Sequence, residues 1–376
     1  MSDESLAQPP QPEAPYPEAP YKALAGSPTA ERAPQELRGL HYPFGRWVPE
    51  GGTLFEVMPG IHWLRMPLPF GLDHINLWAL DAGDSWALVD TGVNLGITKK
   101  YWEALFKGPL AGKPVSRIIA THYHPDHLGL AGWLCERWNV PLEIARTEYL
   151  LARTLTLDVR AAPPQEAVDF SIRAGWSDAA LDELRSKPWG NFSKIVSPLP
   201  AGFKRIRDGT VLTIGTRQWQ VVTGRGHSPE HSCLVSDGVM ISGDQVLPRI
   251  TSNVSVYPTE PYADPLADWL ESIETLRSID PDILVLPAHN EPFRGLHARL
   301  DQLRDDHHDK LEKLLQFCAE PRTAVDSFAT LFRKPIGEGD YGIATGEAVA
   351  HLHWLEERGK LRRTTDAGGV DRFVAA

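Results

Sequence analysis

Three histidines and one aspartate fall within the short stretch Thr121-His122-Tyr123-His124-Pro125-Asp126-His127. Imidazole nitrogens and carboxylate oxygens are the ligands that zinc and similar divalent ions take from proteins. In an extended stretch the side chains of His122 and His124 point to the same side, whereas Asp126 and His127 follow after a bend. The spacing therefore predicts two neighbouring metal sites rather than one.

Four further motifs accompany this cluster along the chain. They are Leu88-Val89-Asp90-Thr91-Gly92, Gly226-His227-Ser228-Pro229, Ser242-Gly243-Asp244 and Ala288-His289. With the His-x-His-x-Asp-His cluster, they resemble the signature of the metallo-β-lactamase-fold hydrolases over roughly Trp47 to Gly295. The resemblance implies an α/β protein with the four-layered αββα fold, whose metal ions lie in a cleft at one edge of the two sheets.

The resemblance also implies a role for each motif residue. One ion would be held by His122, His124 and His227, the other by Asp126, His127 and His289, and Asp244 would bridge both. Asp90 would accept an imidazole N–H and so orient a ligand. Two divalent ions about 3.5–4 Å apart share a water and lower its pKa towards ~7, so a bridging hydroxide is the expected nucleophile. Asp126 and Asp244 are the expected catalytic carboxylates.

Differences between this sequence and other branches of the superfamily favour hydrolysis as its reaction. Diiron oxygen reductases of this fold carry Glu where this chain has His124. Zinc β-lactamases with a cysteine ligand place it where Asp244 stands, and Cys233 comes too early to replace it. The metal motif resembles that of the hydroxyacylglutathione hydrolases. The ligand set suits zinc, iron or manganese, and the general order of affinities favours zinc.

Five residues near the motifs are candidates for lining the substrate site: His74, Glu230, Arg249, Asn253 and Tyr257. Each also has a structural interpretation, as a strand edge, a solvated side chain or a turn. The helical, aromatic-containing segment 147–200 is either a wall over the cleft or ordinary core.

Apolar runs place these residues on elements. Strands are expected at Ile75–Leu80, Trp86–Val89, Val115–Ala120, Gln218–Thr223, Val239–Ser242 and Asp282–Leu286. Asp264 and Pro265 are typical of a helix start, and the apolar residues that follow fall on one face. The predicted ligands therefore lie just after strands.

Three regions are predicted along the chain. Residues 1–38 contain eight prolines and are expected to be a disordered tail. Residues 39–295 would form the catalytic domain. Residues 296–376 would form a small winged-helix-like domain, with helices at 296–318, 323–332 and 345–358 and a hairpin within 360–374.

Composition excludes several classes of protein. With 42% hydrophobic residues the 376-residue chain can fold, and its three cysteines are too few for a disulfide framework. No apolar run approaches the ~20 residues of a membrane helix, so no membrane association and a cytoplasmic location are expected. The net charge of −11 argues against nucleic acid as a partner.

The leading hypothesis is a binuclear metal-dependent hydrolase of a small-molecule thioester, ester or lactone. The alternatives are a metal-dependent endoribonuclease or phosphodiesterase of the same superfamily, and a non-catalytic, metal-stabilised interaction module. Residues 296–376 carry 12 basic and 14 acidic side chains, which does not favour binding to RNA. The oligomeric state stays open.

Overall fold

The computed structural model describes residues 34–69 and 71–376. Most of the predicted tail, residues 1–33, lies outside the described residues. Residues 34–38, which the prediction counted with the tail, instead contain the strand β1 (Gln35–Leu37). This strand pairs antiparallel with β2 (Leu40–Tyr42).

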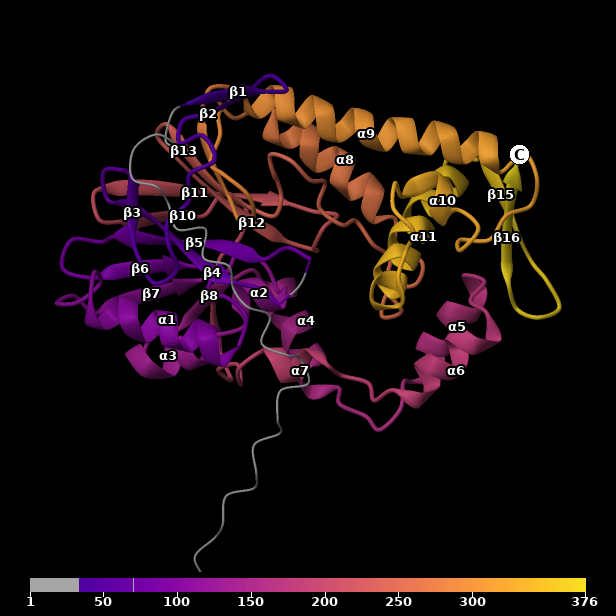
Figure 1. The fold of residues 1–376 in the computed structure, drawn as a ribbon, viewed down its shortest axis with the longest axis horizontal. Helices are drawn as coiled ribbons and strands as arrows, with labels where there is room; N and C mark the ends of the chain where they lie inside the picture. The colour runs from indigo at the N-terminus through magenta and orange to yellow at the C-terminus, as the bar shows by residue number, and fades with distance from the viewer. Residues whose placement is uncertain (1–33, 70) are drawn as a thin grey trace, which may run out of the picture.

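Two sheets form the centre of the molecule (Figure 1). The seven-stranded sheet contains, in spatial order, β3 (Phe55–Met58), β4 (Ile61–Pro67), β5 (His74–Asp81), β6 (Trp86–Val89), β7 (Val115–Ile119), β8 (Leu142–Ile144) and β9 (Phe203–Arg205). The five-stranded sheet contains β10 (Val211–Ile214), β11 (Arg217–Gly224), β12 (His231–Ser236), β13 (Val239–Gly243) and β14 (Leu284–Pro287). Pairing is antiparallel from β3 to β6 and from β10 to β13, and parallel from β6 to β9 and from β13 to β14.

Strand β5 shows how the sequence produces the layers. Successive side chains of a strand point to opposite faces of its sheet. Trp78 and Leu80 face the core between the two sheets, whereas Leu77 and Ala79 face the helices on the other side. Both faces are therefore buried, which explains the nearly continuous apolar run of this strand.

Helices cover the outer face of each sheet. On the seven-stranded sheet lie α1 (Gly96–Lys107), α2 (Pro125–Leu128), α3 (Ala131–Trp138) and α4 (Arg146–Leu157). On the five-stranded sheet lie α8 (Pro265–Leu276) and α9 (Leu296–Phe317), and α11 (Tyr341–Glu357) packs against these two helices. These four layers are the αββα fold expected from the sequence. As predicted, α8 begins after Asp264, whose side chain accepts a hydrogen bond from the Ala267 N–H at 3.2 Å.

The C-terminal region consists of α9, α10 (Phe328–Leu331), α11 and the hairpin of β15 (Leu361–Thr365) and β16 (Asp371–Ala375). The helix predicted at 323–332 is wrong in its first half. Residues 324–327 are turns, and the side chains of Thr323 and Asp326 accept each other's backbone N–H groups, at 2.8 and 3.1 Å. The N–H groups of Ser327 and Phe328 donate to carbonyls three residues earlier, as in turns, rather than four residues earlier, as in an α-helix. The winged-helix-like character of this region stays a prediction.

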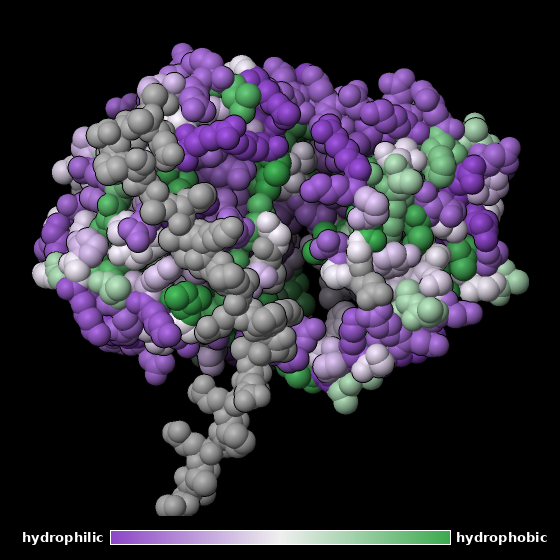
Figure 2. Space-filling model, in the orientation of Figure 1, coloured by the Kyte–Doolittle hydropathy of each residue, from purple (hydrophilic) through white to green (hydrophobic). Residues whose placement is uncertain are grey.

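The segment between α4 and β9 contains α5 (Gln165–Arg173), α6 (Asp178–Ser186) and α7 (Phe192–Ile195). Figure 1 shows α5 and α6 extending to the β15–β16 hairpin. Arg173 and Asp371 are 2.9 Å apart there, and the Trp176 indole donates to the Thr345 hydroxyl. Helix α5 thus packs on the C-terminal region and α6 packs on α5, and Figure 2 shows a hollow between that region and the body that carries the sheets. In the described part of the chain, no helix is both long and apolar enough to cross a membrane.

Candidate metal centre

Loops that follow strands bring the seven predicted ligands together. The cluster from His122 to His127 follows β7 and enters α2, whose first residue is Pro125. His227 follows β11, Asp244 comes directly after β13, and His289 comes two residues after the end of β14. Because these strands end at the same edge of the two sheets, side chains far apart in the sequence meet there.

The seven side chains form two neighbouring groups of donor atoms. One contains His122, His124, His227 and Asp244, and the other contains Asp126, His127 and His289, with the donor atoms of each group within 4.8 Å of one another. Asp244 lies between the groups. Its Oδ2 is 3.4 Å from Nε2 of His227, and its Oδ1 is 3.4 Å from Nε2 of His289.

The spacing of these atoms fits bound ions better than direct hydrogen bonds. His127 Nε2 and Asp244 Oδ1 are both buried, lie 3.5 Å apart and find no hydrogen-bond partner among the described residues. Direct N–H···O bonds are usually about 2.7–3.2 Å long. Ligands bound at about 2.0–2.1 Å in a tetrahedral arrangement would lie about 3.4 Å apart. The cluster therefore fits a site for divalent metal ions.

In three of the histidines, the ring nitrogen Nδ1, which points away from the cluster, is hydrogen-bonded to a neighbouring residue. Nδ1 of His127 donates to Asp90 at 2.8 Å, Nδ1 of His227 to the carbonyl of Asn253 at 2.7 Å, and Nδ1 of His289 to the carbonyl of His74 at 2.9 Å. Such contacts fix the tautomer and direct Nε2 of each ring towards the centre of the cluster.

Asp90 adopts a backbone conformation that is unusual for its residue type, with φ of 62°. Non-glycine residues rarely occupy this region, and where they do the surroundings must hold them there. The Asp90 carboxylate accepts a hydrogen bond from the Thr121 N–H at 2.8 Å in addition to the one from His127. It therefore connects the turn after β6 to the start of the histidine cluster.

The turn before Asp244 requires a glycine. Gly243 has φ of 50°, and a Cβ there would lie 2.5 Å from Nε2 of His231. His231 is fully buried, and its Nε2 accepts the Asp244 N–H at 3.1 Å. Sequence reasoning did not give His231 this role, although it lies only four residues after His227.

Both carboxylates of the cluster stay ionised at neutral pH. Burial opposes ionisation of Asp126, but His127 and His289 lower the pKa of its carboxyl group to about 2. Burial likewise opposes charge on Asp244, and His289 and His127 hold its pKa well below the usual value. Burial lowers the pKa of His122, so this ring is neutral. Burial opposes charge on His289, but Asp244 and Asp126 raise its pKa to about 10. Metal ions bind anionic oxygens and neutral imidazoles, so an ion at His289 would displace a proton.

Of the five candidates for lining the substrate site, Tyr257 borders the cavity next to His227. The side chain of His74 is buried beneath His289, where it contacts Asp73 and the Asn290 N–H. Arg249 pairs with Glu291 at 3.0 Å. These two side chains have structural partners, and neither borders that cavity.

Two other candidates contact helices. The Glu230 carboxylate accepts the Thr147 N–H at the start of α4, at 2.7 Å. The Asn253 amide donates to Glu347 of α11 at 3.0 Å, while the Asn253 carbonyl orients His227. Both candidates therefore act on elements that support the cluster.

Glu148 is a functional residue that sequence reasoning missed. It is fully buried in α4, and its carboxylate accepts hydrogen bonds from the Tyr123 N–H at 2.9 Å, the Ser228 hydroxyl at 2.8 Å and the Glu230 N–H at 2.6 Å. Burial raises its pKa to about 7, although these hydrogen bonds oppose the rise. Glu148 joins the loops of His122–His127 and His227, and no signal in the sequence marks it as buried.

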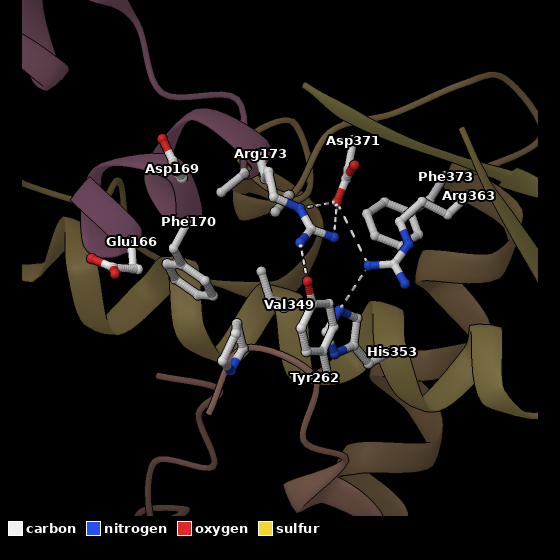
Figure 3. A pocket seen from close by; sticks show the side chains of 13 residues that line it. Glu166, Asp169, Phe170, Arg173, Tyr262, Val349, His353, Arg363, Asp371 and Phe373 are labelled. Carbon is white, nitrogen blue, oxygen red and sulfur yellow. Dashed lines mark hydrogen bonds and ion pairs between the residues drawn. The ribbon is translucent and has the colours of Figure 1, made fainter. Parts of the chain in front are cut away.

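Two cavities lie near these elements. One, of about 660 Å³, is bordered by His227, Tyr123, Leu150, Leu151 and Tyr257, among others, and opens beside the metal cluster. Figure 3 shows the other, of about 410 Å³, between α5, α11 and the hairpin. Its Arg173 and Arg363 both point to Asp371, and none of the seven cluster residues lines it.

Comparison with known proteins agrees with this geometry. The model of the metallo-beta-lactamase superfamily matches residues 70–289, which is more than half of the chain, and a metallo-beta-lactamase-like C-terminal domain matches residues 311–376. The crystal structure of a beta-lactamase domain protein from Burkholderia ambifaria is 45% identical, with a TM-score of 0.83, over 90% of this chain and 98% of that one.

Three curated relatives carry names that describe hydrolases. A probable metallo-hydrolase, YqjP, of Bacillus subtilis is 25% identical over 78% of this chain and 91% of its own length. A linear primary-alkylsulfatase of a Pseudomonas species is 25% identical over 60% of this chain. An atrochrysone carboxyl ACP thioesterase of Aspergillus fumigatus is 22% identical over 77%. The matches span 43% and 53% of these last two proteins. The chain belongs to the metallo-beta-lactamase superfamily and is a metal-dependent hydrolase.

Proposed function

We propose that the chain hydrolyses ester-like bonds, namely thioesters, esters or lactones, with two divalent metal ions, zinc being the expected ion. The observation that carries the proposal is the position of Asp244, whose two oxygens face the two donor groups separately. Seven donors in two groups, joined by one carboxylate, favour two ions over one. The relative named as a thioesterase supports the choice of an acyl substrate.

Ions in these groups would be held by His122, His124 and His227 and by Asp126, His127 and His289, with Asp244 shared. Bound there, they would supply a low-pKa water and polarise the carbonyl under attack. In hydrolysis the water oxygen bonds to the acyl carbon, the bond from that carbon to the leaving sulfur or oxygen breaks, and a proton passes to the leaving group.

The chain's own residues position the reactants. Asp126 is ionised, and its side chain is 18% exposed, more than that of Asp244, at 10%. It can accept a hydrogen bond from the attacking water and turn a lone pair of the water towards the substrate. Asp90, Asn253 and His74 hold three imidazoles in place, so little reorganisation is needed when a substrate binds.

Metal analysis together with a substrate panel tests the proposal. The panel contains acyl thioesters, aryl esters, lactones, an alkyl sulfate, a phosphodiester and single-stranded RNA. We expect two ions per chain, turnover of at least one acyl class, and weak dependence on salt. RNA cleavage that declines with salt by a log–log slope near −0.7 per phosphate contact would favour the endoribonuclease instead. A chain that binds no ion would refute the proposal.

A further inference from the structure

The cavity beside His227 has a lining that indicates what kind of substrate the enzyme accepts. We propose that it binds an apolar, uncharged acyl chain, and that carboxylates at its mouth select against anionic substrates. The inference rests on the proposed ester hydrolysis and names the substrate class within it. The volume of the cavity, about 660 Å³, lies within the usual range for small-molecule sites.

One wall of the cavity is apolar. Leu150 and Leu151 of α4 border it, and Tyr257 lies on the loop after the bridging Asp244. Leu150 is 53% exposed and Tyr257 is 38% exposed. Leaving such large apolar side chains in water is unfavourable, and an exposed apolar surface that borders a cavity is typical of a binding site. An alkyl chain in this cavity would cover them.

The wall is continuous with the metal cluster. His227, Ser228 and Tyr123 border the same cavity, and Tyr123 lies between the cluster residues His122 and His124. The side chains of Tyr123 and Tyr257 lie next to each other in this lining. A substrate whose carbonyl lies at the cluster would therefore place the rest of its acyl group along Leu150 and Tyr257.

The mouth of the cavity is acidic. Glu260, Asp264 and Asp268 border it together with one basic residue, Arg225. Arg358 pairs with Asp264 at 2.9 Å. Glu260 and Asp268 then have one basic neighbour in the lining, Arg225. A phosphate or sulfate group of a substrate placed here would be repelled by the carboxylates and would lose its hydration.

A matched pair of thioesters tests the charge preference. The pair consists of octanoyl-N-acetylcysteamine and an octanoyl-N-acetylcysteamine that carries a carboxylate at the far end of its acyl chain, so the leaving group and the C–S bond that breaks are the same. With the metal-loaded enzyme at low salt, we expect kcat/KM to be at least 10-fold higher for the uncharged thioester. The double variant Glu260→Gln, Asp268→Asn should reduce this ratio several-fold, whereas Asp182→Asn, an exposed carboxylate on α6, should leave it unchanged.

A chain-length series tests the apolar wall. From acetyl to octanoyl N-acetylcysteamine, kcat/KM should rise by up to about 4-fold per added methylene, the factor expected for burying one methylene. Leu150→Ser should flatten this rise, because it lowers kcat/KM for the octanoyl thioester more than for the acetyl thioester. Leu157→Ser is the matched control, because Leu157 is 68% exposed on the same helix and does not border the cavity.

The possible outcomes separate the two proposals. Turnover with equal rates for the two octanoyl thioesters, or with a flat chain-length profile, would overturn this inference and leave the proposed ester hydrolysis standing. A clear preference for the thioester with the carboxylate on its acyl chain would do the same. If no ester, thioester or lactone were hydrolysed, the proposed function would fail, and this inference with it.

Discussion

At the scale of single residues, the metal cluster depends as much on the neighbours of its donors as on the donors themselves. The Asp244 N–H donates a hydrogen bond to the buried ring of His231, while the Asp244 carboxylate lies between the two donor groups. Hydrogen bonds to Asp90 and to the carbonyl of His74 fix the ring orientations of His127 and His289, respectively. These donors are thus oriented before any ion binds, which favours tight binding.

Replacing Asp244 with Ala should remove at least one ion and lower kcat/KM by 100-fold or more, because both donor groups lose the carboxylate that they share. Metal content by mass spectrometry and turnover of the best thioester measure this. Asp244→Asn, which keeps the size of the side chain, separates loss of charge from loss of packing. A variant that kept two ions and full turnover would contradict the bridging position.

Glu148 should make stability depend on pH. Burial raises the pKa of Glu148 to about 7, above its usual 4.5, so the folded state holds a proton that the unfolded state has lost. The resulting stabilisation is complete below about pH 4.5 and is lost as the pH rises through about 7. Over that window it falls by an amount on the order of 3 kcal/mol.

The measurement compares the free energies of unfolding of wild type and Glu148→Gln by urea denaturation between pH 4.5 and 8. We expect the wild type to lose stability relative to the variant as the pH rises. The Gln amide faces one backbone N–H and leaves it without an acceptor, so the variant should start about 1–3 kcal/mol less stable. Parallel pH profiles would show that Glu148 does not titrate in this range.

At the scale of elements, contacts between helices and ligand loops hold the site. The first turn of α4 has no side-chain cap of its own, since Ala145 precedes it, and Glu230 from the His227 loop accepts the Thr147 N–H instead. On the other side, Glu347 of α11 accepts the Asn253 amide and contacts Lys310 of α9 at 3.3 Å. Helices from both halves of the sequence thus reach loops that carry ligands.

Glu230→Ala should destabilise the fold by about 1 kcal/mol, because the start of α4 loses its acceptor. The change should leave kcat/KM within about 2-fold, since Glu230 does not border the cavity beside His227. Thermal unfolding and thioester turnover give the two quantities, and Glu230→Gln, which keeps an acceptor, is the control. A large loss of turnover with unchanged stability would instead make Glu230 a substrate contact.

Sequence patterns predicted those helices and strands that are determined by residues close together in the chain. The strands at 75–80, 86–89, 115–120 and 239–242 were predicted because buried strands appear as apolar runs. Helix α8 was predicted from its Asp-Pro start. The partners of Glu148, His74 and Arg249 could not be predicted, because they come from residues far away in the sequence. The turns at residues 324–327 also involve a residue far away in the sequence, because the Val325 N–H donates to the carbonyl of Ala174.

At the scale of the whole molecule, one apolar core crosses the predicted boundary at residue 295. It contains Met240 and Val285 of the five-stranded sheet, Leu300 of α9, Leu352 of α11 and Phe373 of the hairpin. Residues on both sides of the boundary therefore exclude water from the same core. The division into 39–295 and 296–376 stays a prediction about sequence regions.

The shared core predicts a single unfolding transition. Removal of residues 296–376 would expose the apolar faces of α8 and of the five-stranded sheet, so the remainder should not fold stably. Calorimetry of the full chain at a fixed metal concentration should show one cooperative peak. Two well-separated peaks, or a soluble and cooperatively folded fragment of residues 39–295, would show that the two regions fold independently.

The contact between Asn253 and Glu347 limits how the chain can be recombined with its relatives. A chimaera that keeps residues up to 295 and takes its C-terminal region from another superfamily member inherits His227 but not the helix that supports it. Such a hybrid could retain all seven donors and still bind metal weakly, because the ring of His227 would lose its fixed direction. Recombination should therefore preserve function only when Asn253 and its carboxylate partner are inherited together.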